Sequence, residues 1–320
     1  MAGLSFVPLD ERGFGVEVKF DPLLGCSGAD RARGFVDAAE EHRRELRAAI
    51  HSGRGLLLVR GLEGIVDEPG LLVRLSRVFG IAEDYREGRD APVYLSDEHP
   101  EIAVISNAPP SSRDVPELPE PELTPSGGIP TQYPHRRGWH TDDSFRRPPP
   151  DISLFYAVQP TPLGQGQTLF ADMSAAWDAL PLELRHAVED RELVAAHTNP
   201  WVSRSRDAVL SGASLLPVPA RAQAFSGDAA PSVWQPCVCD HPETGRRALY
   251  LSDCCQLDFV DGPMSSPTHI FSRGPGSDGD EMMTELVSHS THERFVVIHD
   301  WQLGDLVPTL DNDSKTPRDE

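Results

Sequence analysis

Short apolar runs separated by glycine, proline and polar residues recur along the chain, and they limit the folds that it can form. Their length and their content of β-branched and aromatic residues predict strands. These strands are expected within residues 4–20, 55–62, 101–107, 152–160, 168–173, 245–252, 294–301 and 304–310. They do not alternate regularly with helices, as the strands of a doubly wound parallel sheet would. The pattern predicts an α+β chain built on a β-sandwich or jelly roll with flanking helices.

Helical periodicity is found in four stretches, where apolar residues recur at helical spacing among charged ones. They are 27–53, 68–80, 174–188 and 278–290. The first is expected to end at Gly53, because glycine readily takes the conformation that closes a helix. The third is expected to begin with Ser174 as its N-cap, because a serine side chain can accept an N–H group of the first turn.

The stretch 108–137 carries no periodicity and is rich in proline, serine and acidic residues. A loop of this length inside a compact domain is usually either disordered or functional, as a lid over an active site is. It leads directly into the sequence GWHTDDSF, residues 138–145. This position favours an active-site loop or lid.

The chain is strongly acidic, since 29 Lys and Arg residues against 50 Asp and Glu residues give a net charge of −21. This field repels polyphosphate and anionic lipid, so no nucleic-acid or membrane partner is expected. A small anionic substrate is compatible, because His135–Arg137 and Arg146–Arg147 form local basic clusters. The cysteines are odd in number, and no apolar run resembles a signal peptide or a membrane span. These features predict a cytoplasmic location.

His140, Thr141 and Asp142 place a histidine and a carboxylate two positions apart. On a strand, residues at this spacing point to the same face and can converge on one ion. Imidazole and carboxylate, joined by a second imidazole from a distant strand, form the facial triad of non-heme Fe(II) oxygenases, which leaves positions open for a cosubstrate and O₂. Taken alone, the three residues are also explained by a surface histidine beside acids.

Several longer segments occur in order around this pair. They are FVPLDERGFGVEVKF, GRGLLLVRGL, LSRVFG, EHPEIAVISN, WHTDDSFRRPPPDISLFYAVQPTPLGQGQTLFADMSAAWDALP, HPETGRRALYLS and WQLGDLV. In this order, and nearly from end to end, the chain resembles the taurine dioxygenase (TauD/TfdA-like) family of Fe(II)/2-oxoglutarate-dependent oxygenases. The longest segment is the most specific, because it holds the histidine–aspartate pair, a proline-containing turn and the run GQTLFADM.

The resemblance implies one domain over residues 1–320, with a double-stranded β-helix (the cupin-like jelly roll) as its core. It implies that His140 and Asp142 ligate Fe(II), that Thr168 contacts a carboxylate of the cosubstrate 2-oxoglutarate, and that Trp139 packs beside the metal. The implied reaction is an oxidation by O₂, foremost a hydroxylation, of a small molecule, with release of succinate and CO₂. The loop around 108–137 would close over the substrate. The substrate and the oligomeric state, a homo-oligomer included, stay open.

The end of the sequence departs from this family's pattern. The family's last core strand continues into Trp-Asp-Asn-Arg, followed by a second histidine ligand and then by an arginine that pairs with the far carboxylate of 2-oxoglutarate. Aligning Leu310–Asp313 with this motif puts Pro317 at the histidine position, or Thr316 after a shift of one residue. No arginine follows at the expected spacing before Glu320. Pro308 also lies inside the last predicted strand, where it is expected to cost a ladder hydrogen bond.

Three hypotheses about the incomplete motif remain open. Another residue could complete the site: His299 is the nearest in sequence, Asp311 and Asp313 are alternatives, and Arg318 could replace the carboxylate anchor. The chain could instead be a diverged member with impaired catalysis, or a binding protein that keeps the fold without turnover. A metal-dependent hydrolase of cupin type would share the barrel but would not explain the GQTLFADM run.

Overall fold

The computed structural model describes residues 3–21, 28–82, 84, 96, 98–105, 123–132, 139–142, 150–189, 192–196, 232–241, 243–251, 256–259 and 278–310. Helices and strands are mixed along the chain, in agreement with the α+β prediction. The chain divides into two compact units, each with its own apolar core. Unit 1 consists of Met1–Asp114, Ile152–Thr168 and Ile298–Leu310, and unit 2 of Val115–Asp151, Leu169–Val297 and Asp311–Glu320.

Unit 1 is built on a mixed sheet in which a late segment of the sequence lies between two earlier ones. Its strands are β1 (Gly3–Pro8), β2 (Val16–Asp21), β3 (Leu57–Val59), β4 (Ile152–Tyr156) and β12 (Leu306–Leu310). Their order in the sheet is β1-β2-β3-β12-β4. The β2–β3 pair is parallel, and the other neighbours are antiparallel. Because β12 lies between β3 and β4, residues far apart in the sequence meet along it.

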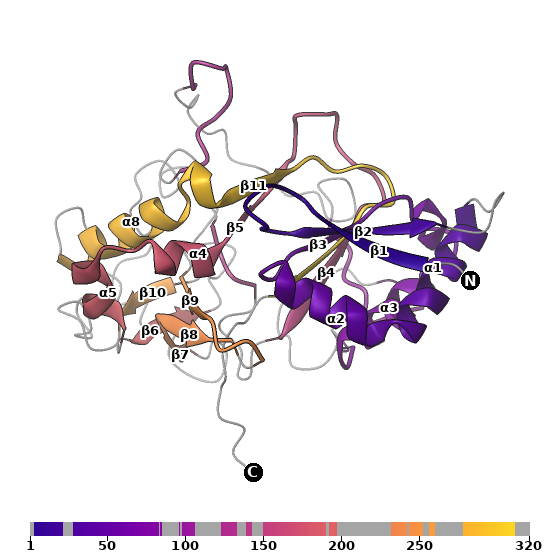
Figure 1. Ribbon diagram of the computed structural model, residues 1–320, viewed down its shortest axis with the longest axis horizontal. Coiled ribbons are helices and arrows are strands. Elements are labelled where there is room, and N and C mark those ends of the chain that lie inside the picture. The colour runs from indigo at the N-terminus through magenta and orange to yellow at the C-terminus, as the bar shows by residue number, and fades with distance from the viewer. Residues whose placement is uncertain are drawn as a thin grey trace, which may run out of the picture. The chain divides into compact units, whose positions relative to one another are not determined.

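Helices lie against this sheet (Figure 1), and their buried apolar side chains form one cluster with it. The helices are α1 (Gly28–Glu41), α2 (Arg43–Ser52) and α3 (Gly70–Phe79), with the 3-10 turn η1 (Glu63–Ile65). The buried side chains of Phe35, Ile50 and Leu75 pack in one cluster with Leu57 and Leu306 of the sheet. Burying an apolar side chain of this size contributes about 1.5–3 kcal/mol. This core therefore stabilises the position of β12 inside the sheet.

The helix predicted over 27–53 is divided in two at His42, where φ is −103° and ψ is 31°. The hydrogen bonds continue across the bend, because the N–H of His42 reaches Ala38 O and the N–H of Leu46 reaches His42 O. The prediction of one helix was wrong here, since helical periodicity persists on both sides and does not reveal the bend. The predicted end at Gly53 is confirmed.

Pro308 lies inside β12 without interrupting it. β12 pairs with β4 along its whole length, and Pro308 stands opposite Leu154. On the other side, the ladder to β3 holds at Leu306, and an isolated bridge follows at Thr309. Since proline has no N–H to donate, the predicted loss of a ladder hydrogen bond falls on the β3 side.

The strand predicted over 101–107 is not formed by residues 101–105, which are its described part. Ile102 donates its N–H to His99 O in a turn, so this group is not available to a neighbouring strand. Ile105 is 84% exposed. The prediction of a strand was wrong here, since among the described residues of this stretch only Ala103 forms a bridge.

Unit 2 contains short helices and small sheets. The helical elements are α4 (Met173–Asp178), α5 (Leu182–Val188), α8 (Asp278–Ser290) and the 3-10 turn η2 (Glu293–Phe295). The strands β6 (Glu192–Ala196), β7 (Ser232–Pro236) and β10 (Gln256–Phe259) form a sheet in the order β10-β6-β7. A further pair in unit 2 joins β8 (Val238–Asp240) to β9 (Arg247–Leu249). The strands β5 (Thr168–Ala171) and β11 (Val296–His299) also pair, and the boundary between the two units falls within both of them. Trp177, Leu249, Leu286 and Phe295 are central to the core of the unit.

The helix predicted over 174–188 is also two helices. Proline lacks the N–H that a helix interior needs, and Pro181 stands instead at the N-cap position of α5. Asp172, rather than Ser174, caps α4, because its carboxylate accepts an N–H of the first turn at 2.9 Å. The Ser174 hydroxyl donates to a carbonyl of β9 at 2.8 Å, so the capping prediction was wrong.

The described helices are short, and α1, with 14 residues, is longer than α8 with 13. In the part of the chain that the structure describes, no helix is long and apolar enough to cross a membrane.

His241 is buried at the turn between β8 and β9, where its Nδ1 accepts the N–H groups of Glu243 and Thr244 at 3.0 and 3.2 Å. Burial lowers the pKa of the His241 imidazole below its usual value of 6.5. The unfolded chain therefore binds a proton at this imidazole more readily than the folded chain does. The stabilisation from neutral His241 is fully present above the pKa of the unfolded state and is lost as the pH falls below it. We predict that the free energy of unfolding decreases from about pH 7 to about pH 5, with at most about 1.4 kcal/mol per pH unit from this group.

Urea unfolding at the two pH values measures this dependence. His241→Asn should flatten it, because an asparagine side chain can accept the same N–H groups but does not titrate. His186→Asn, on the exposed surface of α5, is the matched control and should keep the wild-type slope. A wild-type slope in His241→Asn would show that another group is responsible.

Candidate functional site

His140 and Asp142 lie together in unit 2, with His140 Nε2 3.0 Å from Asp142 Oδ1. Residues 139–142 form neither helix nor strand, so the same-face argument for a strand does not apply to this pair. Along a strand the two side chains would be about 6–7 Å apart, and the irregular backbone allows their closer approach. The side chains are 47% and 33% exposed, so both remain accessible to a small ion or ligand.

The pair is held on a segment that contacts the end of β9. The hydroxyl of Thr141, between the two residues, donates to Leu251 O at 3.4 Å. The preceding residue, Trp139, is partly buried, and its Nε1 is buried with no hydrogen-bond partner among the described residues. The described contact of this segment with another element of unit 2 is thus the one that Thr141 makes just beyond β9.

The donor set of this pair fits a cation such as Fe(II). Imidazole nitrogen and carboxylate oxygen are both ligands of non-heme iron. Neighbouring ligands at about 2.1 Å from an octahedral cation lie about 3 Å apart, and the observed separation is 3.0 Å. An ion pair without a metal has the same separation, so the geometry is compatible with both and metal titration decides between them.

Thr168 lies in unit 1, at the first position of β5. Its Oγ1 accepts the indole N–H of Trp301 at 2.8 Å. Trp301 follows β11 and is partly buried. The position of the Thr168 hydroxyl, which the sequence predicts as a cosubstrate contact, is therefore stabilised by the indole of Trp301, from a distant part of the sequence.

His299, the candidate third ligand, lies in unit 1 and is 7% exposed. Its Nε2 is 3.2 Å from Asp305 Oδ2, an ion-pair distance without hydrogen-bond alignment. Its ring packs edge-on against Trp301, with centroids 4.5 Å apart and an interplanar angle of 86°. These contacts give His299 a structural role within its own unit.

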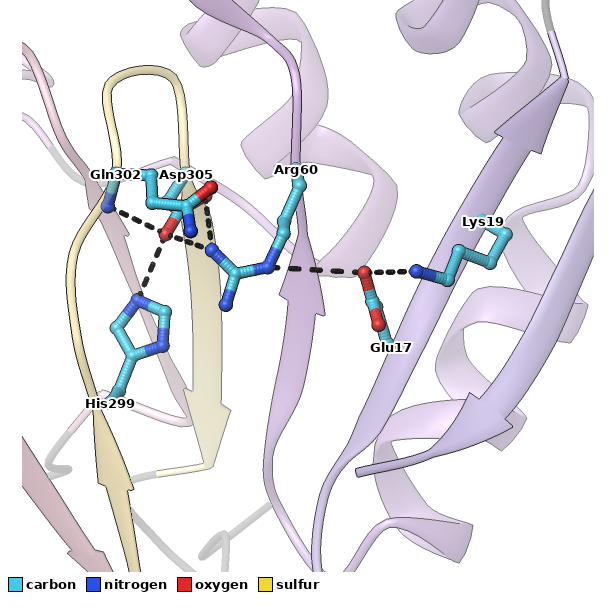
Figure 2. A network of polar contacts seen from close by, with 6 residues as sticks. All are labelled: Glu17, Lys19, Arg60, His299, Gln302 and Asp305. Atoms are coloured by element: carbon cyan, nitrogen blue, oxygen red, sulfur yellow. Dashed lines mark hydrogen bonds and ion pairs between the residues drawn. The ribbon is translucent and has the colours of Figure 1, made fainter. Parts of the chain in front are cut away.

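Asp305 is the centre of a polar network that the sequence did not single out (Figure 2). Its buried carboxylate accepts two bonds from Arg60 Nη1, at 3.1 and 2.8 Å, and the backbone N–H of Gln302 at 2.9 Å. Beyond Arg60, the network continues through Glu17 to Lys19, so positive and negative charges alternate along it. The sequence WQLGDLV, one of the segments that resemble the family, contains Asp305. Nothing in the sequence indicates that Arg60 is its partner.

A glycine makes the turn before Asp305. Gly304 has φ +77°, and a Cβ there would lie 2.4 Å from Glu63 N. Its carbonyl accepts the N–H of Leu62, and its own N–H donates to Ala157 O. This close backbone approach brings the turn before β12 against the chain that follows β3.

A third metal ligand is not identified. The described residues hold no group of three His, Cys, Asp or Glu side chains placed to bind a metal ion. The alternatives Asp311 and Asp313, and residues 316–318, lie outside the described part of the chain, as do the basic clusters at 135–137 and 146–147.

The sequence matches the family described as "Taurine catabolism dioxygenase TauD, TfdA family" over residues 19–314. It is 32% identical over 169 residues to an alpha-ketoglutarate-dependent 2,4-dichlorophenoxyacetate dioxygenase of Cupriavidus pinatubonensis, covering 53% of this chain and 50% of that protein. It is 29% identical over 170 residues to pentalenolactone F synthase of Streptomyces arenae, covering 53% and 52%. The chain therefore spans about half the length of the curated relatives that it matches.

Two solved structures show a similar fold. AAD-2 in complex with Mn(II) and N-oxalylglycine aligns with a TM-score of 0.59 at 23% identity, covering 97% of this chain and 88% of that one. A taurine dioxygenase from Burkholderia xenovorans aligns with a TM-score of 0.60 at 20% identity, covering 96% and 81%. At these identities the likeness concerns the fold alone.

Proposed function

The chain belongs to the TauD/TfdA family of taurine catabolism dioxygenases, and we propose that it is an Fe(II)/2-oxoglutarate-dependent oxygenase that oxidises a small molecule. The observation that carries the proposal is the contact between His140 and Asp142, which pairs the two ligand types of a non-heme iron site within the family match. The irregular, accessible segment that holds them supports it, because a ligand site must be reachable from solvent.

In this proposal, His140 and Asp142 bind Fe(II), which supplies the chemistry that couples decarboxylation of 2-oxoglutarate by O₂ to hydroxylation of the substrate, with release of succinate and CO₂. The imidazole of His140 offers a neutral nitrogen ligand, and the carboxylate of Asp142 offsets part of the ion's charge. The Thr168 hydroxyl donates to a carboxylate of 2-oxoglutarate and orients it. Trp139 packs beside the metal.

The proposal also includes the fold around the site and the location of the protein in the cell. We propose one domain over residues 1–320 with a double-stranded β-helix core, a loop around 108–137 that closes over the substrate and excludes water, and a cytoplasmic location. The fold likeness to AAD-2 and to a taurine dioxygenase supports the core. The names of two relatives, one acting on 2,4-dichlorophenoxyacetate and one a pentalenolactone F synthase, support a small organic substrate.

A second candidate is a member of the family that binds metal and cosubstrate without turnover. The observation that favours it is Pro317 at the aligned position of the second histidine ligand, because a proline side chain cannot ligate a metal. His299 does not easily replace that histidine, since its Nε2 faces Asp305.

Anaerobic addition of Fe(II) and then 2-oxoglutarate separates these candidates. The oxygenase should develop a visible metal-to-cosubstrate charge-transfer band, and admission of O₂ should then release succinate in an amount that a matching small-molecule substrate increases. The band without succinate would indicate the non-catalytic member. Neither band nor succinate would contradict both, and 2-oxoglutarate-independent hydrolysis would indicate a cupin-type hydrolase.

A further inference from the structure

The hydrogen bond between Trp301 and Thr168 determines what the threonine hydroxyl can do. An indole N–H can only donate, so Thr168 Oγ1 must be the acceptor of this 2.8 Å bond. The hydroxyl's own proton is then left to be donated elsewhere. In the part of the chain that the structure describes, neither a side chain nor a carbonyl accepts that proton. With respect to the described residues, the hydroxyl therefore remains able to donate to a ligand or to solvent.

The tryptophan is itself held in place. The His299 ring packs edge-on against it with centroids 4.5 Å apart. His299 lies 3.2 Å from the buried carboxylate of Asp305, which also accepts the N–H of Gln302 and two bonds from Arg60 (Figure 2). The buried ring of His299 thus covers one side of the indole, while the N–H of Trp301 is directed at Thr168.

We propose that Trp301 is a positioning residue for the cosubstrate: its N–H occupies a lone pair of Thr168 and commits the threonine proton to a carboxylate of 2-oxoglutarate. This inference rests on the proposed function, because it takes 2-oxoglutarate as the ligand of Thr168. In this arrangement the hydroxyl is oriented as a donor before the ligand binds, so the free energy of binding includes no cost for reorienting it. Trp301 need not touch the cosubstrate to have this effect.

Substitutions of Thr168 and of Trp301 should weaken 2-oxoglutarate binding by different amounts. A hydrogen bond to a charged group is worth more than a neutral one, so Thr168→Val should weaken 2-oxoglutarate binding by about 10- to 100-fold. Trp301→Phe keeps an aromatic ring beside His299 but removes the N–H together with part of the indole, and it should weaken binding by about 3- to 10-fold. Thr168→Ser keeps the hydroxyl and should bind within about 3-fold of the wild type.

Calorimetric titration of 2-oxoglutarate into the full chain loaded with Mn(II) tests these values. The variants are Trp301→Phe, Thr168→Val, Thr168→Ser and the double variant Trp301→Phe/Thr168→Val. The double variant should bind no more weakly than Thr168→Val alone, because the indole acts through the hydroxyl. Trp177→Phe is the matched control for loss of an indole elsewhere in the chain, and it should leave the affinity for 2-oxoglutarate unchanged.

A spectroscopic readout separates positioning from a general loss of structure. The indole ¹H–¹⁵N resonance of Trp301, assigned by its absence in Trp301→Phe, should move upfield in Thr168→Val and stay in place in Thr168→Ser. If the wild type binds 2-oxoglutarate and Trp301→Phe binds it equally well, the inference is overturned and the proposed function is not. Additive losses of affinity in the double variant would have the same meaning. Absence of 2-oxoglutarate binding by the wild type would overturn the proposed function, and the inference with it.

Discussion

His140→Ala and Asp142→Ala are each expected to lower 2-oxoglutarate turnover by at least about a thousand-fold and to weaken binding of Fe(II). Each variant removes one of the two ligands that lie 3.0 Å apart. The transition-state stabilisation that a bound metal supplies is worth several kcal/mol, and each 1.4 kcal/mol is a factor of about ten in rate. Succinate formation measures the turnover, and calorimetric titration with Mn(II) measures the metal affinity without O₂.

The exposed histidine of α5 provides the control for this prediction. His186→Ala removes an imidazole from unit 2 and should keep both wild-type turnover and wild-type Mn(II) affinity. If His140→Ala and Asp142→Ala bind Mn(II) as the wild type does, the two side chains form an ordinary ion pair and the metal lies elsewhere. The metal titration remains informative even if the wild type proves to be a binding protein without turnover.

Local patterns predicted most of the elements, because strand and helix periodicity depend on neighbouring residues. The end at Gly53 and the strands β4 and β5 needed no information from the rest of the chain. The failures were also local in cause. His42 bends a helix whose periodicity continues, and Pro181 could have been recognised as a break because proline removes a helical N–H.

Long-range pairing was beyond what the sequence could predict. The position of β12 between β3 and β4 depends on segments from three parts of the chain. At the candidate site, the His140–Asp142 pair was predictable because its two members are two positions apart, and they meet on an irregular segment rather than on a strand. The Arg60–Asp305 pair joins residues 245 positions apart, and no periodicity connects them.

Removing either partner of this Arg60–Asp305 pair should destabilise the chain by about 3–5 kcal/mol, because a buried charge that loses its partner is left uncompensated. The two substitutions should not cost the same. The Asp305 side chain is 1% exposed, whereas that of Arg60 is 35% exposed. Arg60→Met leaves a carboxylate that water cannot reach and should be at the upper end of the range. Asp305→Ala leaves a guanidinium that water can reach and should be at the lower end.

An exposed arginine cluster supplies the control for urea unfolding of these variants. Arg74 makes three hydrogen bonds to Asp37 and Glu40, more than Arg60 makes to Asp305. Its carboxylate partners are 67% and 38% exposed, so Arg74→Met should cost no more than about 1 kcal/mol. Bond counting alone predicts the opposite ranking. If Arg74→Met destabilises the chain as much as Arg60→Met, burial is not what makes the Asp305 network important. If Arg60→Met costs several times more, burial of the carboxylate is what makes the Arg60–Asp305 pair important for stability.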